Sequence, residues 1–408
     1  MTTSLIIAND LPSVSRPRVR LEYIDGMRGL AALFVVLHHG HQIITSNGGR
    51  PLPAIVRLMN IPLQYGHYAV AVFIVLSGYC LMLPVARSKT RSLDGGLKRF
   101  LTRRAIRILP TYYASLLLSL ALIALLPVLR APHSSLQSTY LPAFEPKVIV
   151  SHLLLIHNFW REWVWKINRP HWSVALEWQI YFAFAFVLIP CWRRFGNVGA
   201  IVVAFTISCL PYFLLPHTRH FERTAPWLFC LFAMGMTAAT VNFSHLRIDR
   251  TQRGRIPAGV STLICVTLLL AASTVWPALG MEYQMRFDLL GGAATSFFLV
   301  YATQRSMDEP QRLPLVIRIL QSPFLAGLGL FSYSLYLIHD PLLWTALIPM
   351  QIRGWSQGLQ YAVLILLIVP GCILVSYGFH LLFERPFVRV LARPAKTKEI
   401  PGNPMSAI

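Results

Sequence analysis

Two ionisable residues, Arg28 and His39, lie in the first long apolar segment of the chain. In an α-helix they would be roughly 16 Å apart along the axis, which is about half the thickness of the hydrocarbon core of a bilayer. Ionisable side chains are costly inside a membrane, so they are candidates for function. A fixed cation near one membrane face and an imidazole deep in the bilayer therefore mark the first candidate site.

The composition is that of a membrane protein. Of the 408 residues, 55% are hydrophobic and 13% are charged, whereas a soluble protein carries about 25% charged residues. The net charge of +21 does not indicate nucleic-acid binding, because the basic residues lie between apolar segments, as in the cytoplasmic loops of membrane proteins. The first twenty residues lack the apolar core of a cleavable signal peptide, so the first helix is expected to direct its own insertion.

About ten apolar segments approach the ~20 residues that a membrane-spanning helix needs. We predict an all-α polytopic membrane protein with helices at approximately 26–46, 64–86, 108–129, 172–191, 198–215, 226–243, 258–280, 287–303, 321–350 and 359–383. Most Lys and Arg residues fall in inner loops if the N-terminus is cytoplasmic, so both termini are predicted to be cytoplasmic. The expected division is a cytoplasmic segment 1–22, a transmembrane domain 23–386 and a cytoplasmic tail 387–408.

Counting along the helices places three polar groups at similar depth. His39 lies roughly 10 Å and Glu177 roughly 8 Å below the predicted outer face, and His339 with Asp340 falls in the outer half of the ninth segment. A neutral imidazole beside a carboxylate is a general base with an orienting partner. The alternative is that His39 only hydrogen-bonds a neighbouring helix. A long outer loop, about 130–171, could cover an outward-facing cavity.

A basic cluster opens the third segment, where Arg103, Arg104 and Arg107 lie within about one helical turn. Guanidinium groups bind phosphate through bidentate, charge-assisted hydrogen bonds. The same cluster also fits an ordinary cytoplasmic anchor, which is the simpler interpretation of these residues alone.

Six short runs, taken in order along the chain, resemble the motifs of one family. They are Arg28 and His39 with ten residues between them, Phe73-Ile-Val-Leu-Ser-Gly-Tyr79, Arg104-Ala-Ile-Arg107, Trp172-Ser-Val-Ala-Leu-Glu-Trp-Gln-Ile-Tyr181, Ser332-Tyr-Ser-Leu-Tyr-Leu-Ile-His339 and Glu384-Arg-Pro386. The chain thus resembles the acyltransferase-3 family of membrane acyltransferases from Tyr23 to Pro386. One departure is that only the first acid of the family's Glu-Glu-Gln-Phe-Tyr pattern is kept, as Glu177.

The resemblance implies transfer of an acyl group, most simply acetyl, from cytoplasmic acyl-coenzyme A to a hydroxyl of an extracytoplasmic carbohydrate such as O-antigen or exopolysaccharide. It implies a bacterial inner-membrane enzyme with no tightly bound cofactor. His39, Arg28 and Glu177 would be catalytic, and Arg103, Arg104 and Arg107 would hold the donor phosphates. Further candidates for contacts with the donor or acceptor are Ser77, Trp172, Ser173, Tyr181, Tyr333 and His339.

Two expectations concern metals and rival functions. The six cysteines have no CxxC spacing and are expected to be packing residues, so no metal site is predicted. The rival class is a multi-pass transporter or flippase for an anionic or glycolipid substrate, in which the buried His and Glu residues would relay protons. The absence of an internal repeat and the order of the motifs count against the rival.

Overall fold

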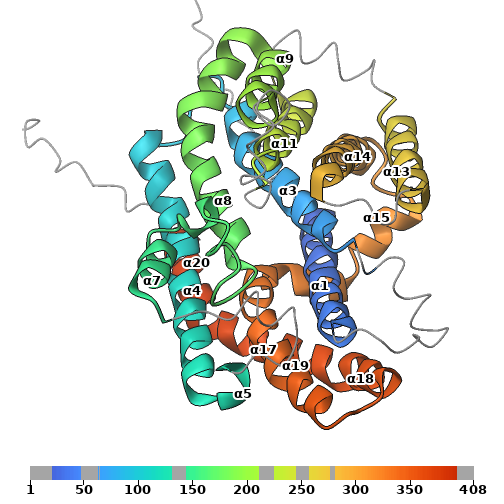
Figure 1. Cartoon of the computed structure of the whole chain (residues 1–408). Helices are drawn as coiled ribbons and strands as arrows, with labels where there is room; N and C mark the ends of the chain where they lie inside the picture. Colours follow the sequence, from blue (N-terminus) through green and yellow to red (C-terminus); the bar gives the residue numbers. More distant parts are fainter. Residues whose placement is uncertain are drawn as a thin grey trace, which may run out of the picture.

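The computed structural model describes residues 21–46, 63, 65–130, 144–210, 225–244, 257–275 and 281–392. Every regular element in these ranges is a helix, and the helices pack side by side in one bundle (Figure 1). The first half contributes α1 (Glu22–Thr45), α3 (His67–Arg87), α4 (Gly96–Leu125), α5 (Pro127–Arg130), α7 (Pro146–Leu153), η1 (His157–Phe159), α8 (His171–Ala183), η2 (Phe184–Leu188) and α9 (Ile189–Ser208). The second half contributes α11 (Leu228–Phe243), α13 (Ala258–Val275), α14 (Met281–Asp308), α15 (Leu315–Leu320), α16 (Pro323–Leu330), α17 (Ser332–Ile352), α18 (Gln357–Val363), η4 (Leu364–Ile368), α19 (Val369–Phe379), η5 (His380–Glu384) and α20 (Arg385–Ala392).

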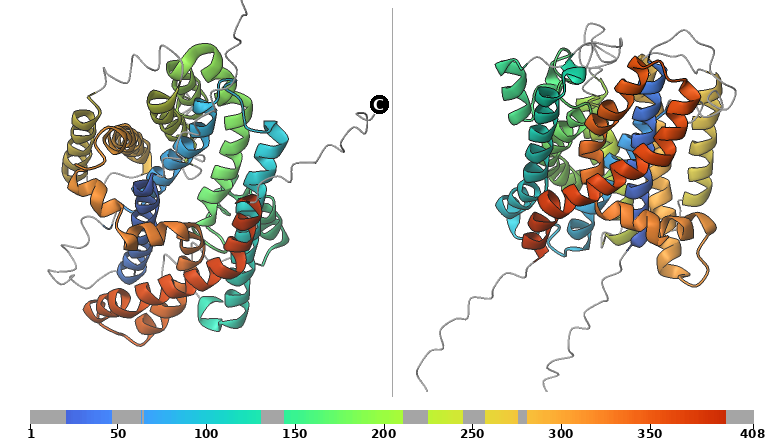
Figure 2. Two further views of the ribbon diagram at one scale, coloured as in Figure 1. Left: turned by 180° about the vertical axis from the view of Figure 1, so that it is seen from behind. Right: turned by 90° about the horizontal axis from the view of Figure 1, so that it is seen from below.

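The predicted all-α fold is confirmed for the described residues, and helices occupy most of each predicted segment. By length and composition, four of these helices can cross a membrane: His67–Arg87, Gly96–Leu125, His171–Ser208 and Gln357–Leu391. The remaining crossings, and the orientation of the chain in the membrane, stay predictions. The start of α1 and the end of α20 lie at the same end of the bundle (Figure 2).

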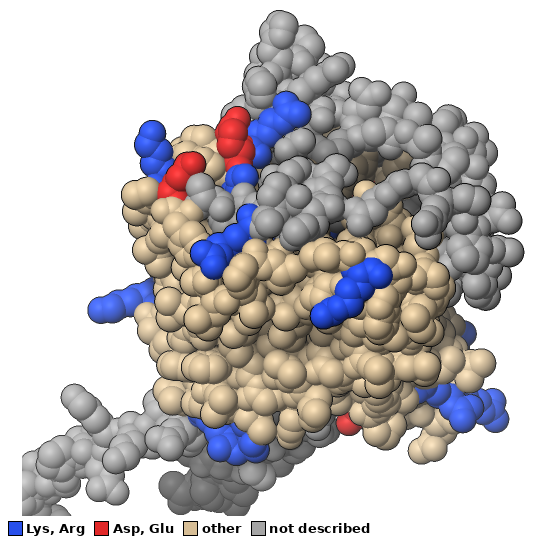
Figure 3. Space-filling model, turned by 60° about the horizontal axis from the view of Figure 1, so that its bottom comes forward, with Lys and Arg blue, Asp and Glu red and all other residues tan. Residues whose placement is uncertain are grey.

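The outer surface is strongly apolar. Figure 3 shows a broad band of uncharged residues with Lys and Arg side chains above and below it. Leu366, Leu374 and Leu382 from the C-terminal helices are 70%, 72% and 68% exposed. Exposed apolar surface of this extent is unfavourable in water and favourable against lipid tails. The chain is therefore a membrane protein.

Three prolines reshape the long helices without ending them. Pro190, Pro370 and Pro386 each follow a π-helical turn (η2, η4 and η5) by two residues. Proline has no N–H to donate, and its ring collides with the carbonyl four residues before it. A wider π turn accommodates both effects, so the chain can continue as a bent helix.

Glycines allow two helix pairs to approach closely. A Cβ added to Gly78 on α3 would lie 2.1 Å from the carbonyl oxygen of Phe232, and one added to Gly235 on α11 would lie 2.0 Å from the carbonyl oxygen of Val75. At the crossing of α1 and α16, a Cβ on Gly29 would meet the carbonyl oxygen of Leu325 at 2.2 Å. Backbone contact at these crossings holds α1 and α3, two of the helices that carry the candidate site.

Replacing Gly78 by Ala should therefore force α3 and α11 apart and destabilise the protein by about 1–3 kcal/mol, as overpacking does elsewhere. Thermal unfolding of the purified protein in detergent measures this effect. The control is Gly371→Ala on α19, where an added Cβ meets nothing within 4 Å and the better helix former should leave the melting temperature unchanged or raise it. Equal melting temperatures for the two variants would contradict the close crossing.

Candidate active site

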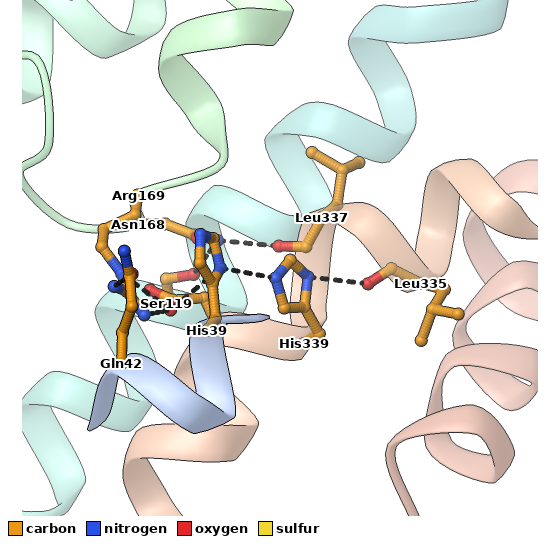
Figure 4. Close-up of polar contacts among 9 residues, drawn as sticks. His39, Gln42, Ser119, Asn168, Arg169, Leu335, Leu337 and His339 are labelled. Atoms are coloured by element: carbon orange, nitrogen blue, oxygen red, sulfur yellow. Dashed lines mark hydrogen bonds and ion pairs between the residues drawn. The ribbon is translucent and has the colours of Figure 1, made fainter. Parts of the chain in front are cut away.

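The imidazoles of His39 on α1 and His339 on α17 are in direct contact (Figure 4). Nδ1 of His39 lies 2.8 Å from Nε2 of His339, and the Nδ1 of His339 lies 3.1 Å from the carbonyl oxygen of Leu335. Because a carbonyl only accepts, neutral His339 carries its proton on Nδ1 and accepts at Nε2. His39 then donates from Nδ1, which leaves the lone pair of His39 on Nε2.

A buried ion pair lies beside the two histidines. The Nε of Arg169 donates to Oδ1 of Asp340 at 2.9 Å, and its Nη2 donates to the same oxygen. Both side chains are only 4% exposed. The Nη1 of Arg169 donates to Gln42 at 2.9 Å, and Oδ1 of Asp340 lies 3.6 Å from Nδ1 of His39. The carboxylate favours a positive charge on His39 when that ring takes up a proton, and the neighbouring guanidinium of Arg169 opposes it.

A proline next to the site creates a second contact to the same loop. Pro341 follows Asp340 in α17 and has no N–H for the carbonyl of Leu337, four residues earlier. The side-chain amide of Asn168 donates to that carbonyl at 2.8 Å (Figure 4). Asn168 also donates to Ser119 on α4 at 3.1 Å. The loop before α8 is thus attached to α17 at two adjacent points, through Asn168 and Arg169.

His39 opens into a cavity that we call the histidine cavity. Its lining is mainly polar and aromatic: His38, His39, Gln42, His67, Trp165, Arg169, Trp172, Gln284 and Tyr336, with Val35, Gly66, Val70 and Ala225. Trp165 and Arg169 come from the loop that was predicted to cover an outward-facing cavity, and both residues line the histidine cavity.

A second polar group lies at the histidine cavity, where His67 is part of the lining. Nε2 of His67 on α3 lies 3.5 Å from Oδ1 of Asp288 on α14, and Nε1 of Trp227 donates to Oδ2 of the same carboxylate at 2.8 Å. Asp288 is buried. Two lining histidines, His39 on α1 and His67 on α3, therefore each lie near a buried carboxylate.

A neighbouring cavity, which we call the arginine cavity, contains most of the other predicted residues. It is lined by Arg28, Arg104, Arg107 and Glu177 together with Ser77, Cys80, Ser173, Tyr181, Ser332, Tyr333 and Tyr336, and by apolar residues Val70, Phe73, Ile74, Leu81, Ile108 and Val174. Its three guanidinium groups face one carboxylate, so the cavity carries excess positive charge. The Nε of Arg104 is buried without a hydrogen-bond partner among the described residues, so its N–H can donate to an anion in the cavity.

Arg28 is fixed by two contacts within its own cavity. One Nη atom lies 3.3 Å from Asp25, one turn earlier on α1, and the other lies 3.2 Å from the sulfur of Cys80 on α3. Cys80 therefore contributes to the wall of the cavity in addition to packing. Arg28 and His39 thus lie on one helix but open into different cavities.

Glu177, expected at a depth similar to that of His39, has no hydrogen bond to His39 in the described part of the chain. Among the described residues, the Glu177 carboxylate accepts hydrogen bonds from Ser77 at 2.8 Å and from Tyr181, and it lines the arginine cavity. The preceding Asn168 and Arg169 are 2% and 3% exposed, so α8 begins where the chain is already buried in the bundle.

The remaining predicted residues are divided between the two cavities. Trp172 and His39 belong to the histidine cavity, with His339 behind His39, whereas Ser77, Tyr181 and Tyr333 belong to the arginine cavity. Ser173 lines the arginine cavity and shares a 2.6 Å hydrogen bond with Tyr336. Arg103 lines neither cavity; its side chain is 42% exposed, and its guanidinium lies 3.8 Å from Asp94. Its expected role with Arg104 and Arg107 therefore has no support from its position.

Sequence reasoning missed Arg169, Asn168 and Gln42. One signal was available, because Pro341 directly after Asp340 predicts an orphan carbonyl at Leu337 that a nearby donor must satisfy. The donor itself comes from a loop, and no periodic pattern places a loop residue.

The protein has a buried network of His39, His339, Asp340 and Arg169, and a cationic cavity lies next to it. This arrangement is typical of an enzyme that binds an anionic substrate close to a general base. A family model described as an acyltransferase domain matches residues 21–380. The chain belongs to this family, acyltransferase-3, and its kind of activity is O-acyl transfer. No curated protein and no solved structure matches the chain significantly.

Removing one partner of the Arg169–Asp340 pair should cost about 3–5 kcal/mol, because the other charge is left buried without compensation. Arg169→Met and Asp340→Asn should each lower the melting temperature in detergent strongly. The double variant Arg169→Met/Asp340→Asn should lose much less than the sum of the two single losses. Additive losses would show that the two side chains do not depend on each other.

Proposed function

We propose that this protein transfers an acyl group, acetyl first, from cytoplasmic acyl-coenzyme A to a hydroxyl of an extracytoplasmic carbohydrate. The observation that carries the proposal is the hydrogen-bond chain Leu335–His339–His39, which leaves a lone pair on Nε2 of a histidine that lines a cavity. An imidazole nitrogen with a free lone pair can act as the general base that a hydroxyl needs in order to attack the acyl group.

The arginine cavity suits the donor. Coenzyme A carries several phosphate charges, and Arg104 and Arg107 share one helix face at the cavity wall. The third guanidinium, that of Arg28, is held by Asp25 and Cys80 and adds positive charge along the same path. The pantetheine arm is thin enough to extend from this cavity toward His39.

The histidine cavity suits a polyhydroxylated acceptor. Gln42, Gln284 and His67 supply hydrogen-bonding groups, and Trp165 and Trp172 supply aromatic faces. In the reaction, Nε2 of His39 takes the hydroxyl proton while the hydroxyl oxygen bonds to the thioester carbon. The C–S bond then breaks, and the imidazolium of His39 returns the proton to the coenzyme A thiolate. Asp340 stabilises the imidazolium between these steps.

Incubation of purified protein with radiolabelled acetyl-coenzyme A and candidate glycans tests the proposal. Label should appear in a glycan, and His39→Ala should lower the rate by at least about 10²-fold because the base is lost. His339→Ala should lower it on the order of 10²-fold, because His39 is no longer held in one orientation.

The matched control is His41→Gln. His41 lies on the same helix but hydrogen-bonds Tyr361 on α18 and does not line the histidine cavity. This variant should keep the wild-type rate. Full activity in His39→Ala would exclude the assigned base, and no covalent transfer by the wild type to any glycan would favour a transporter.

Donor binding is tested separately through the Michaelis constant for acetyl-coenzyme A. Arg104→Gln and Arg107→Gln should each raise it about tenfold or more, because a charge-assisted hydrogen bond to phosphate contributes roughly 1.5–3 kcal/mol. Arg103→Gln should change it much less, since Arg103 faces Asp94 outside the cavity. Equal effects of all three substitutions would indicate a general charge effect instead of a donor site.

A further inference from the structure

The two cavities meet at a boundary made by two side chains. Val70 on α3 and Tyr336 on α17 are the residues, among those described, that line both the arginine cavity and the histidine cavity. A donor whose phosphates lie at Arg104 and Arg107 must place its thioester past this boundary to reach His39.

The boundary is held rigidly. The hydroxyl of Tyr336 is 2.6 Å from that of Ser173 on α8, and its ring packs edge-to-face with Phe73 on α3, with 5.7 Å between ring centroids. Tyr336 is 7% exposed and Val70 is 9% exposed. A phenol with contacts to two other helices has little freedom to swing aside.

We propose that Val70 and Tyr336 form a size filter that restricts the transferred group to short acyl chains, with acetyl favoured. This inference rests on the proposed function and names its donor class. Beyond the boundary, polar side chains such as His39 and Gln42 share the lining of the histidine cavity with aromatic ones such as Trp172. The selection for chain length therefore rests on the passage between Val70 and Tyr336.

The test compares acetyl-, butyryl- and hexanoyl-coenzyme A as donors to the glycan that accepts label. Free coenzyme A is quantified by chromatography, and kcat/KM is determined for each donor. In the wild type, kcat/KM should fall by about tenfold or more per added methylene, as in other size-limited pockets. Val70→Ala and Tyr336→Phe should raise the butyryl-to-acetyl ratio, and Val70→Leu should lower it.

Ser173→Ala removes the same hydrogen bond from the other side and should change the ratio in the same direction as Tyr336→Phe. The control, Tyr377→Phe, deletes a phenol hydroxyl on α19 from a side chain that is 47% exposed, and it should leave the ratio unchanged. An unaltered ratio in all boundary variants, or a wild type that prefers hexanoyl, would overturn the filter. Absence of transfer from every donor would instead overturn the proposed function.

Discussion

The carboxylate of Asp340 is buried in an apolar bundle, and a lone buried charge is among the most costly features that a fold can contain. The groups that compensate this charge also hold the site residues in place. Arg169 reaches it from the loop before α8, and the same loop satisfies the carbonyl left open by Pro341 through Asn168. His39 then lies between that carboxylate and His339. Loss of the Arg169–Asp340 ion pair would therefore weaken the attachment of the loop before α8 to α17 and also loosen the orientation of His39.

The helix crossings provide the rigidity that such a network requires. Backbone contact at Gly29, Gly78 and Gly235 allows no adjustment of α1 against α16 or of α3 against α11. α1 carries Arg28 into one cavity and His39 into the other, whereas Arg104 and Arg107 come from α4. The distance between the proposed donor-phosphate site and the base therefore depends on how α1 and α4 are held in the bundle.

The sequence predicted the all-helical fold, and it placed His39, His339 and Asp340 at similar depth, because both inferences follow from helix periodicity and polarity. It placed Glu177 at a similar depth, and in the structure Glu177 lines the arginine cavity and hydrogen-bonds Ser77. It missed Arg169 and Asn168, because the path of a loop depends on which orphan groups it must satisfy. The catalytic roles of these residues stay proposals.

A structure of the protein bound to an acetyl-coenzyme A analogue whose thioester sulfur is replaced by a methylene group tests the account most directly. We expect the phosphates of the analogue at Arg104 and Arg107. Its pantetheine arm should pass between Val70 and Tyr336, and its carbonyl carbon should lie in the histidine cavity next to Nε2 of His39. Binding of the analogue with its phosphates away from the arginine cavity, or with its acyl end away from His39, would contradict it.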